Sequence, residues 1–283
     1  MGDGQDLVDN LRLEEVGPHR YLARNDGVSE RGVVFGGQLL AQLSVAAAKA
    51  DESKTIKSTQ GVFSRTVLST EPAEIDVDVF HVGRVFATAT ATMSQRGRQC
   101  ARAQVLLTSY EEDLIRHAAT MPDVPGPEDS GPWDDQFRRE LRMVDNVDIN
   151  DATVVGPPEM YAWLRVPTAP DEQVIGQALL AHASASFLIG TAMRPHEGMG
   201  QSITHKQISS GIISHTVSFH EPFDVRDWLL MAMESPYAGR GRTYGVGRVF
   251  TRDGELVASF SQENMIRHLP EGHVVAGRES TIL

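Results

Sequence analysis

The feature that most constrains this chain is an internal repeat. Residues 34–44 match residues 174–184 at a constant offset of 140 positions, with the same Val, Gly, Leu-Leu-Ala and Ser residues. Farther along, Gly97 matches Gly254 at an offset of 157. Self-similarity of this kind is the signature of a structural unit made more than once. We therefore expect two copies of one unit, with the additional residues of the second copy inserted mainly between positions 193 and 211.

Each copy begins with a short apolar helix. In the first copy, apolar residues recur at three- and four-residue spacing over residues 39–47, and Ala and Leu dominate the segment. Both features favour a helix. Gly36 and Gly37 stand directly before it. Because so few polar residues interrupt the segment, we expect the helix to be buried on nearly all sides.

Four runs rich in Val, Thr and Phe follow each helix, and their alternating polarity predicts strands. The runs are residues 58–67, 73–82, 85–95 and 99–110 in the first half, and residues 212–223, 228–236, 243–252 and 256–267 in the second. A buried helix wrapped by a curved antiparallel sheet, made in two tandem repeats, is the α+β double hot-dog plan. Fusion of the repeats would pair their sheets edge to edge and cover an exposed edge.

The chain length fits this plan. At 283 residues, it is long enough for two units. We expect an N-terminal hot-dog over residues 1–110, a Pro-rich and acidic connecting segment over residues 111–151, and a C-terminal hot-dog over residues 152–283.

Charge and cysteine content narrow the possible partners. The formal net charge of −12 disfavours nucleic acid. Cys100 is the only cysteine, so no intrachain disulfide can form, and we expect a small buried residue rather than a nucleophile. The sequence lacks a basic segment followed by an apolar one at its start, and no apolar run approaches the length of a membrane span. We therefore expect a cytoplasmic protein without a membrane span.

Several motifs resemble the acyl-CoA thioesterase II family. Residues 34–38, Val-Phe-Gly-Gly-Gln, are similar to the family's first helix start, and residues 215–223 are similar to its His-x-x-x-Phe-His-x-Pro-Phe string. Further matches follow in family order, and the resemblance covers about residues 33–267. It implies hydrolysis of acyl-CoA to a free fatty acid and CoA by an activated water. It further implies acyl-CoA as the partner, no metal or redox cofactor, and a homo-oligomer.

The resemblance also implies a catalytic set, of which this chain keeps one member. The family places an Asp on the second helix, a Thr on the strand after it and a Gln near the end of the last strand. Here those positions hold Ser184, Ile212 and Gln262. An isoleucine cannot hydrogen-bond to water, and a carboxylate that could take the proton of water is absent from the whole segment between Glu172 and Glu197.

Residues at the first helix start are candidates for binding substrate. The free N–H groups of Gly36 and Gly37 carry partial positive charge and could hold a thioester oxyanion, with Gln38 beside them. The alternative is that the two glycines only let helix and sheet pack closely.

Hydroxyl and imidazole groups near the changed positions are further candidates. Ser210 and Ser214 flank the Thr position and could supply a hydroxyl to the substrate. His182 and Ser186 lie four apart on one helical face, so His182 could act as a base, or it could be structural. Ser184 has no base at helical spacing, which favours a role in orienting water or lining the pocket over a role as a nucleophile.

Two functional alternatives remain beside the thioesterase. The changed positions are compatible with a catalytically weak or inactive protein that binds acyl-CoA or acyl chains. Hydration of enoyl-CoA ranks last, because hydratases of this fold use an Asp–His pair that neither helical segment supplies.

Overall fold

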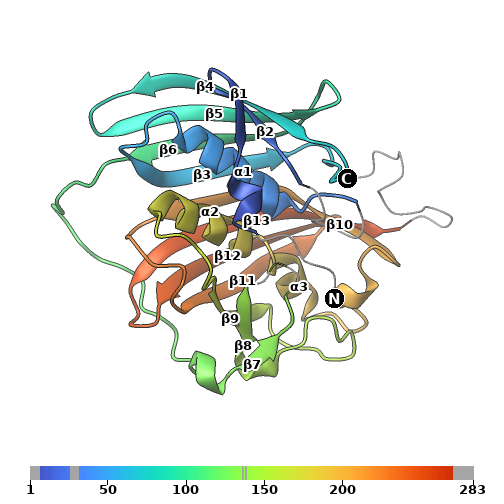
Figure 1. Ribbon diagram of the computed structural model, residues 1–283. Helices are drawn as coiled ribbons and strands as arrows, with labels where there is room; N and C mark the ends of the chain where they lie inside the picture. Colours follow the sequence, from blue (N-terminus) through green and yellow to red (C-terminus); the bar gives the residue numbers. More distant parts are fainter. Residues whose placement is uncertain (1–6, 26–31, 136, 138, 270–283) are drawn as a thin grey trace.

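One continuous antiparallel sheet dominates the protein (Figure 1). The computed structural model describes residues 7–25, 32–135, 137 and 139–269, so residues 1–6 and 270–283 of the two expected hot-dog units lie outside the described part. The described residues form thirteen strands in the order β1-β2-β4-β5-β6-β3-β10-β13-β12-β11-β9-β8-β7. Two principal helices, α1 and α2, lie beside each other against this sheet.

The first repeat contains η1 (Asp9–Leu11), β1 (Glu14–Gly17), β2 (Arg20–Ala23), α1 (Gly36–Ala48), β3 (Thr55–Phe63), β4 (Ala73–Val82), β5 (Phe86–Gln95) and β6 (Arg98–Thr108). The second contains α2 (Gln173–Ser184), α3 (Leu188–Met193), η4 (Gln201–Ile203), β10 (Ile208–Phe219), β11 (Leu229–Gly239), β12 (Arg242–Thr251) and β13 (Leu256–His268). All eight predicted strands and both predicted helices are present, with boundaries shifted by a few residues. The double hot-dog prediction is confirmed.

The two repeats join where β3 pairs with β10. Gln60 lies opposite Thr216, and these two residues are 156 positions apart. Both strands also carry a register shift at equivalent places, between Ile56 and Ser58 in β3 and 156 positions later in β10. The strands are therefore related by a local two-fold axis, and fusion completes one sheet from two edges, as expected.

Both helices are buried, as their composition predicts. Every residue of α1 after Gly36 is buried, and so is every residue of α2 from Gly176 to Ser184. The stretch 173–193 is long and apolar enough to cross a membrane by length and composition, which corrects the sequence-based expectation that no such stretch exists. However, 78% of its most apolar window is buried inside the fold, where α2 serves as a core helix.

The longer second repeat carries its additional residues between α2 and β10. That connection contains α3 and η4, whereas the equivalent connection in the first repeat, from Ala48 to Thr55, is a short turn. Helix α3 begins at Leu188, so the insertion starts earlier than predicted. Leu188 packs against the backbone of Gly245, which ties the insertion to β12.

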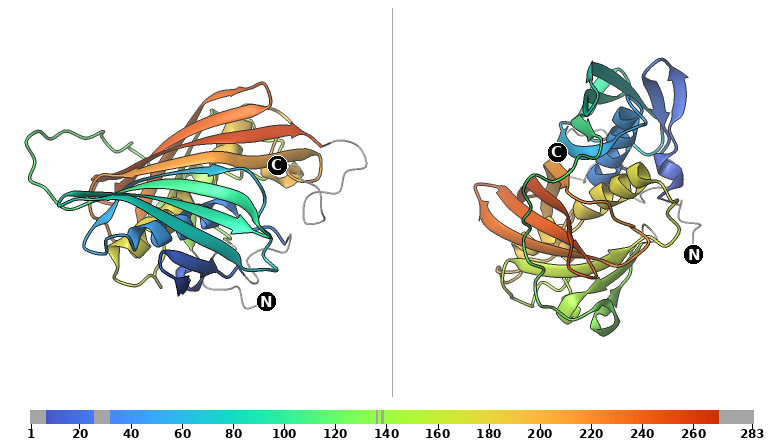
Figure 2. Two further views of the ribbon diagram at one scale, coloured as in Figure 1. Left: turned by 90° about the horizontal axis from the view of Figure 1, so that it is seen from above. Right: turned by 90° about the vertical axis from the view of Figure 1, so that its left-hand side faces the viewer.

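The connecting segment runs along the outside of the C-terminal sheet before it joins that sheet (Figure 2). It contributes η2 (Pro127–Asp129), β7 (Gly131–Trp133), β8 (Glu140–Met143) and η3 (Val144–Asn146), and β9 (Glu159–Arg165) then links it to β11. Irregular turns and short strands of three and four residues explain why periodicity did not reveal β7 and β8.

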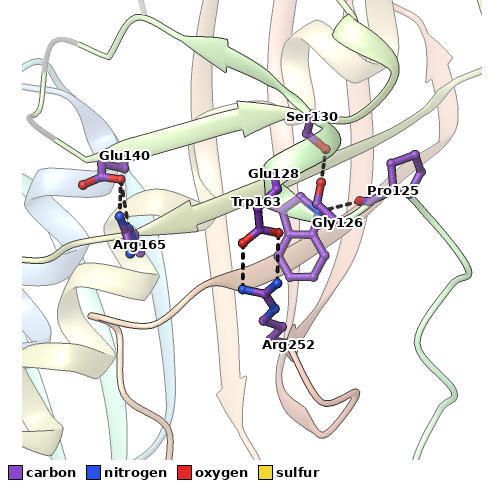
Figure 3. A network of polar contacts seen from close by, with 8 residues as sticks. All are labelled: Pro125, Gly126, Glu128, Ser130, Glu140, Trp163, Arg165 and Arg252. Atoms are coloured by element: carbon purple, nitrogen blue, oxygen red, sulfur yellow. Dashed lines mark hydrogen bonds and ion pairs between the residues drawn. The ribbon is translucent and has the colours of Figure 1, made fainter.

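Polar contacts hold this segment in place (Figure 3). The indole N–H of Trp163 donates to the carbonyl of Pro125 at 2.9 Å. The guanidinium of Arg252 donates to both carboxylate oxygens of Glu128, at 2.9 Å each. The segment is therefore fixed to the outer face of the sheet rather than hanging free there.

Candidate active site

The start of α1 presents two glycines beneath an isoleucine of the other repeat. The N–H of Gln38 is the first to donate back toward the helix start, to the carbonyl of Phe35 at 3.0 Å. The N–H groups of Gly36 and Gly37 precede it and have no intrahelical acceptor. A Cβ added at Gly36 would lie 3.3 Å from Cδ1 of Ile212. The side chain of Ile212 thus covers the positive end of α1.

Gly37 is required for close packing of the two helices. A Cβ at this position would lie 2.6 Å from the carbonyl oxygen of His182 and 3.1 Å from Cβ of Ala185. Real Cβ atoms do not approach a backbone oxygen that closely. The packing explanation for Gly37 is therefore supported directly, and it brings the end of α2 to the start of α1.

The position equivalent to Gly37 in the second repeat holds a longer side chain and lies inside α2, four residues after the helix begins at Gln173. Gln177 occupies the position of Gly37 at the offset of 140, and Ile56 is equivalent to Ile212 at the offset of 156. The Gln177 amide accepts from the N–H of Ile56 at 2.9 Å and donates to its carbonyl at 2.7 Å. This bridge joins the second turn of α2 to β3, and the N–H of Gly176 already donates to the carbonyl of Glu172 at 2.9 Å. The two repeats therefore differ here, because α2 begins three residues before the equivalent of Gly36.

The last residue of α2, Ser184, is bonded to a histidine on β10. Its Oγ lies 2.8 Å from Nε2 of His215 and 3.0 Å from the carbonyl oxygen of Ala181. The first repeat makes the same helix-to-strand contact without an imidazole, because Ser44 donates to Oγ1 of Thr59 at 3.0 Å. A position used for packing in one repeat therefore holds a titratable group in the other.

Gln262 lies on the other side of the imidazole. It stands directly opposite His215 in the pairing of β10 with β13, and it is 1% exposed. Its Nε2 donates to Oδ1 of Asn264 at 2.7 Å, and Nδ2 of Asn264 donates to Oγ1 of Thr243 at 3.1 Å. Ser184, His215, Gln262, Asn264 and Thr243 thus form a row of buried polar side chains, called here the polar chain.

Burial controls the protonation of His215. Desolvation lowers its pKa from 6.5 to about 3, while the neighbouring Gln262 side chain acts in the opposite direction. The imidazole is therefore neutral at physiological pH, and a neutral ring has one nitrogen that donates a hydrogen bond and one that accepts a hydrogen bond.

His182 belongs to a separate group at the same helix end. Its Nδ1 lies 3.3 Å from a guanidinium nitrogen of Arg139, which also donates to Oγ of Ser186 at 3.1 Å. The rings of Phe35 and Phe137 contact the imidazole edge to face. Desolvation, followed by the charge of Arg139, lowers the pKa of His182 well below 6.5.

Arg139 carries its own counterion into this interior. Its guanidinium is paired with Asp135 at 2.8 Å, and the two side chains are only 1% and 7% exposed. A fully buried charge has to be paired in this way. His182 is thus held by a rigid cation and two rings, an environment that sequence spacing alone did not reveal.

The remaining sequence-predicted residues occupy less central places. Gln38 is buried and points toward the carbonyl of Asn10, 3.5 Å from its amide nitrogen, rather than toward β10. Ser214 directly precedes His215, so strand alternation directs it to the opposite face of the sheet. Ser210 is half-buried two residues before Ile212. Of the candidates, Ser184 and Gln262 are brought together through His215, whereas Ser214 is directed away.

Three residues of the polar chain were not identified as site residues from the sequence. They are His215, Asn264 and Thr243. One signal for His215 was available: it is the position equivalent to Thr59, so an imidazole stands where the first repeat needs only a hydroxyl. Asn264 and Thr243 contact each other across two neighbouring strands, so their spacing in the sequence gives no local pattern.

A hollow on the sheet lies away from these residues. A cavity of about 530 Å³ is lined by Thr216, Ser218, Arg248 and Ser261, among others. Thr216 alternates with His215 along β10, so this cavity is on the outer face and not at the helix ends. Cys100 is buried, as predicted, and burial raises the pKa of its thiol.

Comparison with known proteins identifies relatives over almost the whole chain. Profiles described as the acyl-CoA thioesterase N-terminal domain and C-terminal domain match residues 25–108 and 116–266. Acyl-CoA thioesterase 2 of Haemophilus influenzae is 30% identical over 281 residues, covering 92% of this chain and 96% of that protein. Acyl-coenzyme A thioesterase 8 of Mus musculus is 27% identical over 289 residues, covering 92% and 88%.

Solved structures agree with these relatives. The crystal structure of an acyl-CoA thioesterase II from Mycobacterium marinum matches with a TM-score of 0.79 at 27% sequence identity, covering 94% of this chain and 100% of that one. A fused double hot-dog with a buried polar site where its two helices meet places the protein in the class of hot-dog thioester hydrolases. Both halves match the corresponding family profiles. The chain therefore belongs to the acyl-CoA thioesterase family.

Proposed function

We propose that this protein hydrolyses acyl-CoA to a free fatty acid and CoA, with an activated water as the acyl acceptor. The observation that carries this proposal is the difference between the two helix starts. Helix α2 begins three residues before the equivalent of Gly36, so the N–H of Gly176 donates to the carbonyl of Glu172, whereas the glycines at the start of α1 leave N–H groups free of an intrahelical acceptor. Free N–H groups at a helix start can stabilise the oxyanion that forms on a thioester carbonyl.

The catalytic set is atypical for the family that this chain resembles. We assign catalytic positions to Gln262, Ser184 and Ile212, of which the first two can orient reactants by hydrogen bonds and the third shapes the space over the α1 start. The proposed substrate-contacting residues are Gly36, Gly37, Gln38, Ser210, Ser214 and His182. Ser214 requires a rearrangement of β10 to take part, since alternation directs it to the other face.

A second function is favoured by one observation. The side chain of Ile212 lies directly over Gly36, where it restricts access to the free N–H groups. Together with the absence of a carboxylate in α2, this supports a catalytically weak or inactive protein that binds acyl-CoA or acyl chains.

A turnover assay distinguishes the two functions. Purified protein is incubated with acyl-CoAs of graded chain length, and released CoA thiol is followed with a chromogenic disulfide. Release above the buffer rate for at least one chain length is expected. Background release at every length would overturn the thioesterase proposal, and calorimetric binding under those conditions would support the second function.

Assembly and location follow from the family resemblance and stay predictions. We propose a homo-oligomer, because sheets of this fold commonly associate further, and a cytoplasmic location. Light scattering on the purified full chain measures the first, and a mass of about 31 kDa, that of one chain, would contradict it. Fractionation of cells that express the untagged chain measures the second.

A further inference from the structure

We propose that Ser184 is the nucleophile of this enzyme and His215 is its base, so that the acyl group passes through an ester on Ser184 before it reaches water. This inference rests on the proposed thioesterase function and deepens it. It replaces direct attack of water on the thioester by two successive steps at one serine.

The geometry of the pair carries the inference. Oγ of Ser184 and Nε2 of His215 are 2.8 Å apart, within the range of a strong hydrogen bond. A nucleophile bonded to a base, with the base oriented by a third group, is the arrangement that activates serine in unrelated enzymes. The base comes from β10 and not from α2, which is why helical spacing in the sequence did not reveal it.

Gln262 is the positioning residue that orients the base. Its Nε2 is committed to Asn264, which leaves Oε1 available on the side of His215. Oε1 of Gln262 and Nδ1 of His215 are both buried and have no hydrogen-bond partner within the described part of the chain. A proton on Nδ1 directed at Oε1 matches donor to acceptor and leaves Nε2 free to accept the Ser184 proton.

The end of α2 also lies beside a group that can stabilise an oxyanion. Ala185, the residue after Ser184, packs against the position of Gly37, where the N–H groups of the α1 start are located. Ser184 itself has no exposed surface. Access of a thioester to Oγ therefore requires the helix ends to separate from Ile212.

The reaction balances without a cofactor. Oγ of Ser184 bonds to the thioester carbonyl carbon, and its proton moves to Nε2 of His215. The carbon–sulfur bond then breaks, and the proton passes from His215 to the sulfur, which releases CoA as its thiol. In the second step His215 takes a proton from water, the hydroxide adds to the acyl-serine ester, and the fatty acid leaves as Ser184 recovers its proton.

The first repeat supplies a matched control. Ser44 makes the same buried contact from α1 to β3, but its partner Thr59 has no group that could accept a proton. Replacement of Ser44 by Ala removes a helix-to-strand bond of the same kind and leaves the proposed chemistry intact.

The test is detection of the acylated protein. Full-length protein is mixed with excess decanoyl-CoA, quenched in acid within one turnover and examined by intact-mass and peptide mass spectrometry. We expect one added decanoyl group on the peptide that contains Ser184. Ser184→Ala should abolish the adduct and Ser44→Ala should retain it. His215→Asn should slow acylation by a factor of about a hundred or more, the usual contribution of a positioned base.

A further variant separates chemistry from folding. Ser184→Cys keeps the size of the side chain and a nucleophile, and is expected to carry the decanoyl group as a thioester. An adduct on any other residue, or turnover by the wild type with no adduct at Ser184, would overturn the proposal while leaving the thioesterase function standing. Absence of both adduct and thiol release in the wild type would overturn both.

Discussion

Gln177 holds the backbone of Ile56 through both of its polar atoms, in two hydrogen bonds of 2.9 and 2.7 Å. The bond reaches from the second repeat into the first, across the register shift of β3. The pairing of β3 with β10 covers Ser58 to Val62, so Ile56 lies beyond it and is bonded by Gln177 instead. The equivalent residue in the first repeat is Gly37, which lies at the start of α1, whereas Gln177 lies in the second turn of α2.

Replacing this glutamine should cost stability and little else. Gln177→Ala leaves a buried N–H and a buried carbonyl of Ile56 unpaired, which is expected to lower the free energy of unfolding by about 2–4 kcal/mol. Urea titration followed by fluorescence measures the change. Gln99→Ala, at an exposed position of β6, should stay within about 0.5 kcal/mol of the wild type. Equal losses in the two variants would contradict the bridging role.

The two glycines at the α1 start should respond differently to a methyl group. Gly37→Ala places Cβ within 2.6 Å of the His182 carbonyl, so we expect a loss of about 1–3 kcal/mol from overpacking. Gly36→Ala meets only the flexible tip of Ile212 at 3.3 Å, and alanine favours the helix, so its melting temperature should be nearly unchanged. Calorimetry measures the melting temperatures of both variants. A larger loss of stability in Gly36→Ala than in Gly37→Ala would contradict this packing.

Opening the space over Gly36 should raise the rate of hydrolysis. Ile212→Thr removes the Cδ1 methyl group that lies closest to the helix start and adds a hydroxyl, and we expect kcat/KM for acyl-CoA to increase roughly tenfold, equivalent to about 1.4 kcal/mol. Thiol release measures it. Ile213→Thr, at the neighbouring position of β10, is the control and should leave the rate unchanged. A lower rate in Ile212→Thr at unchanged stability would show that the isoleucine assists the substrate instead.

Stability should fall on mild acidification because of the buried imidazoles. The pKa of His215 is about 3 in the folded protein, against 6.5 unfolded, so the unfolded chain takes up the proton first as pH falls. Its contribution is complete above pH 6.5 and declines between pH 6.5 and 3, by up to about 1.4 kcal/mol per pH unit. His182 acts in the same direction. Urea titrations at pH 7.5, 6 and 5 measure this slope.

The matched variant assigns part of that slope to one residue. His215→Asn should flatten the dependence of unfolding free energy on pH, since asparagine does not titrate. A slope identical to that of the wild type would show that His215 is protonated equally in the folded and unfolded chain.

The fold could be predicted from the sequence because the patterns that mark its helices and strands are local and occur in both repeats. Alternation marked the long strands, apolar spacing marked both helices, and the offset between the halves gave the pairing of repeats. The pattern did not reveal β7 and β8, because strands of three and four residues hold too few alternating positions. The pattern did not reveal β1 and β2 for the same reason, since each has only four residues.

The site was harder to predict because its contacts cross between distant elements. Ser184 and Gln262 were identified by resemblance, but the residue that connects them, His215, lies 31 positions after the serine and 47 before the glutamine. Helical spacing tests only neighbours on one element. Arg139 was missed for a related reason, since a charged residue in an irregular segment is ordinarily solvated and this one is enclosed with Asp135.

The central pairing of β3 with β10 has a consequence for synthesis of the chain. While the ribosome makes the second half, β3 is hydrogen-bonded on one side only, to β6, because its other partner does not yet exist. The first repeat ends with β6 at Thr108 and β10 begins at Ile208, so about 100 further residues have to be translated first, which takes on the order of ten seconds. During that interval the nascent first repeat presents a bare strand edge to other nascent chains on the same messenger.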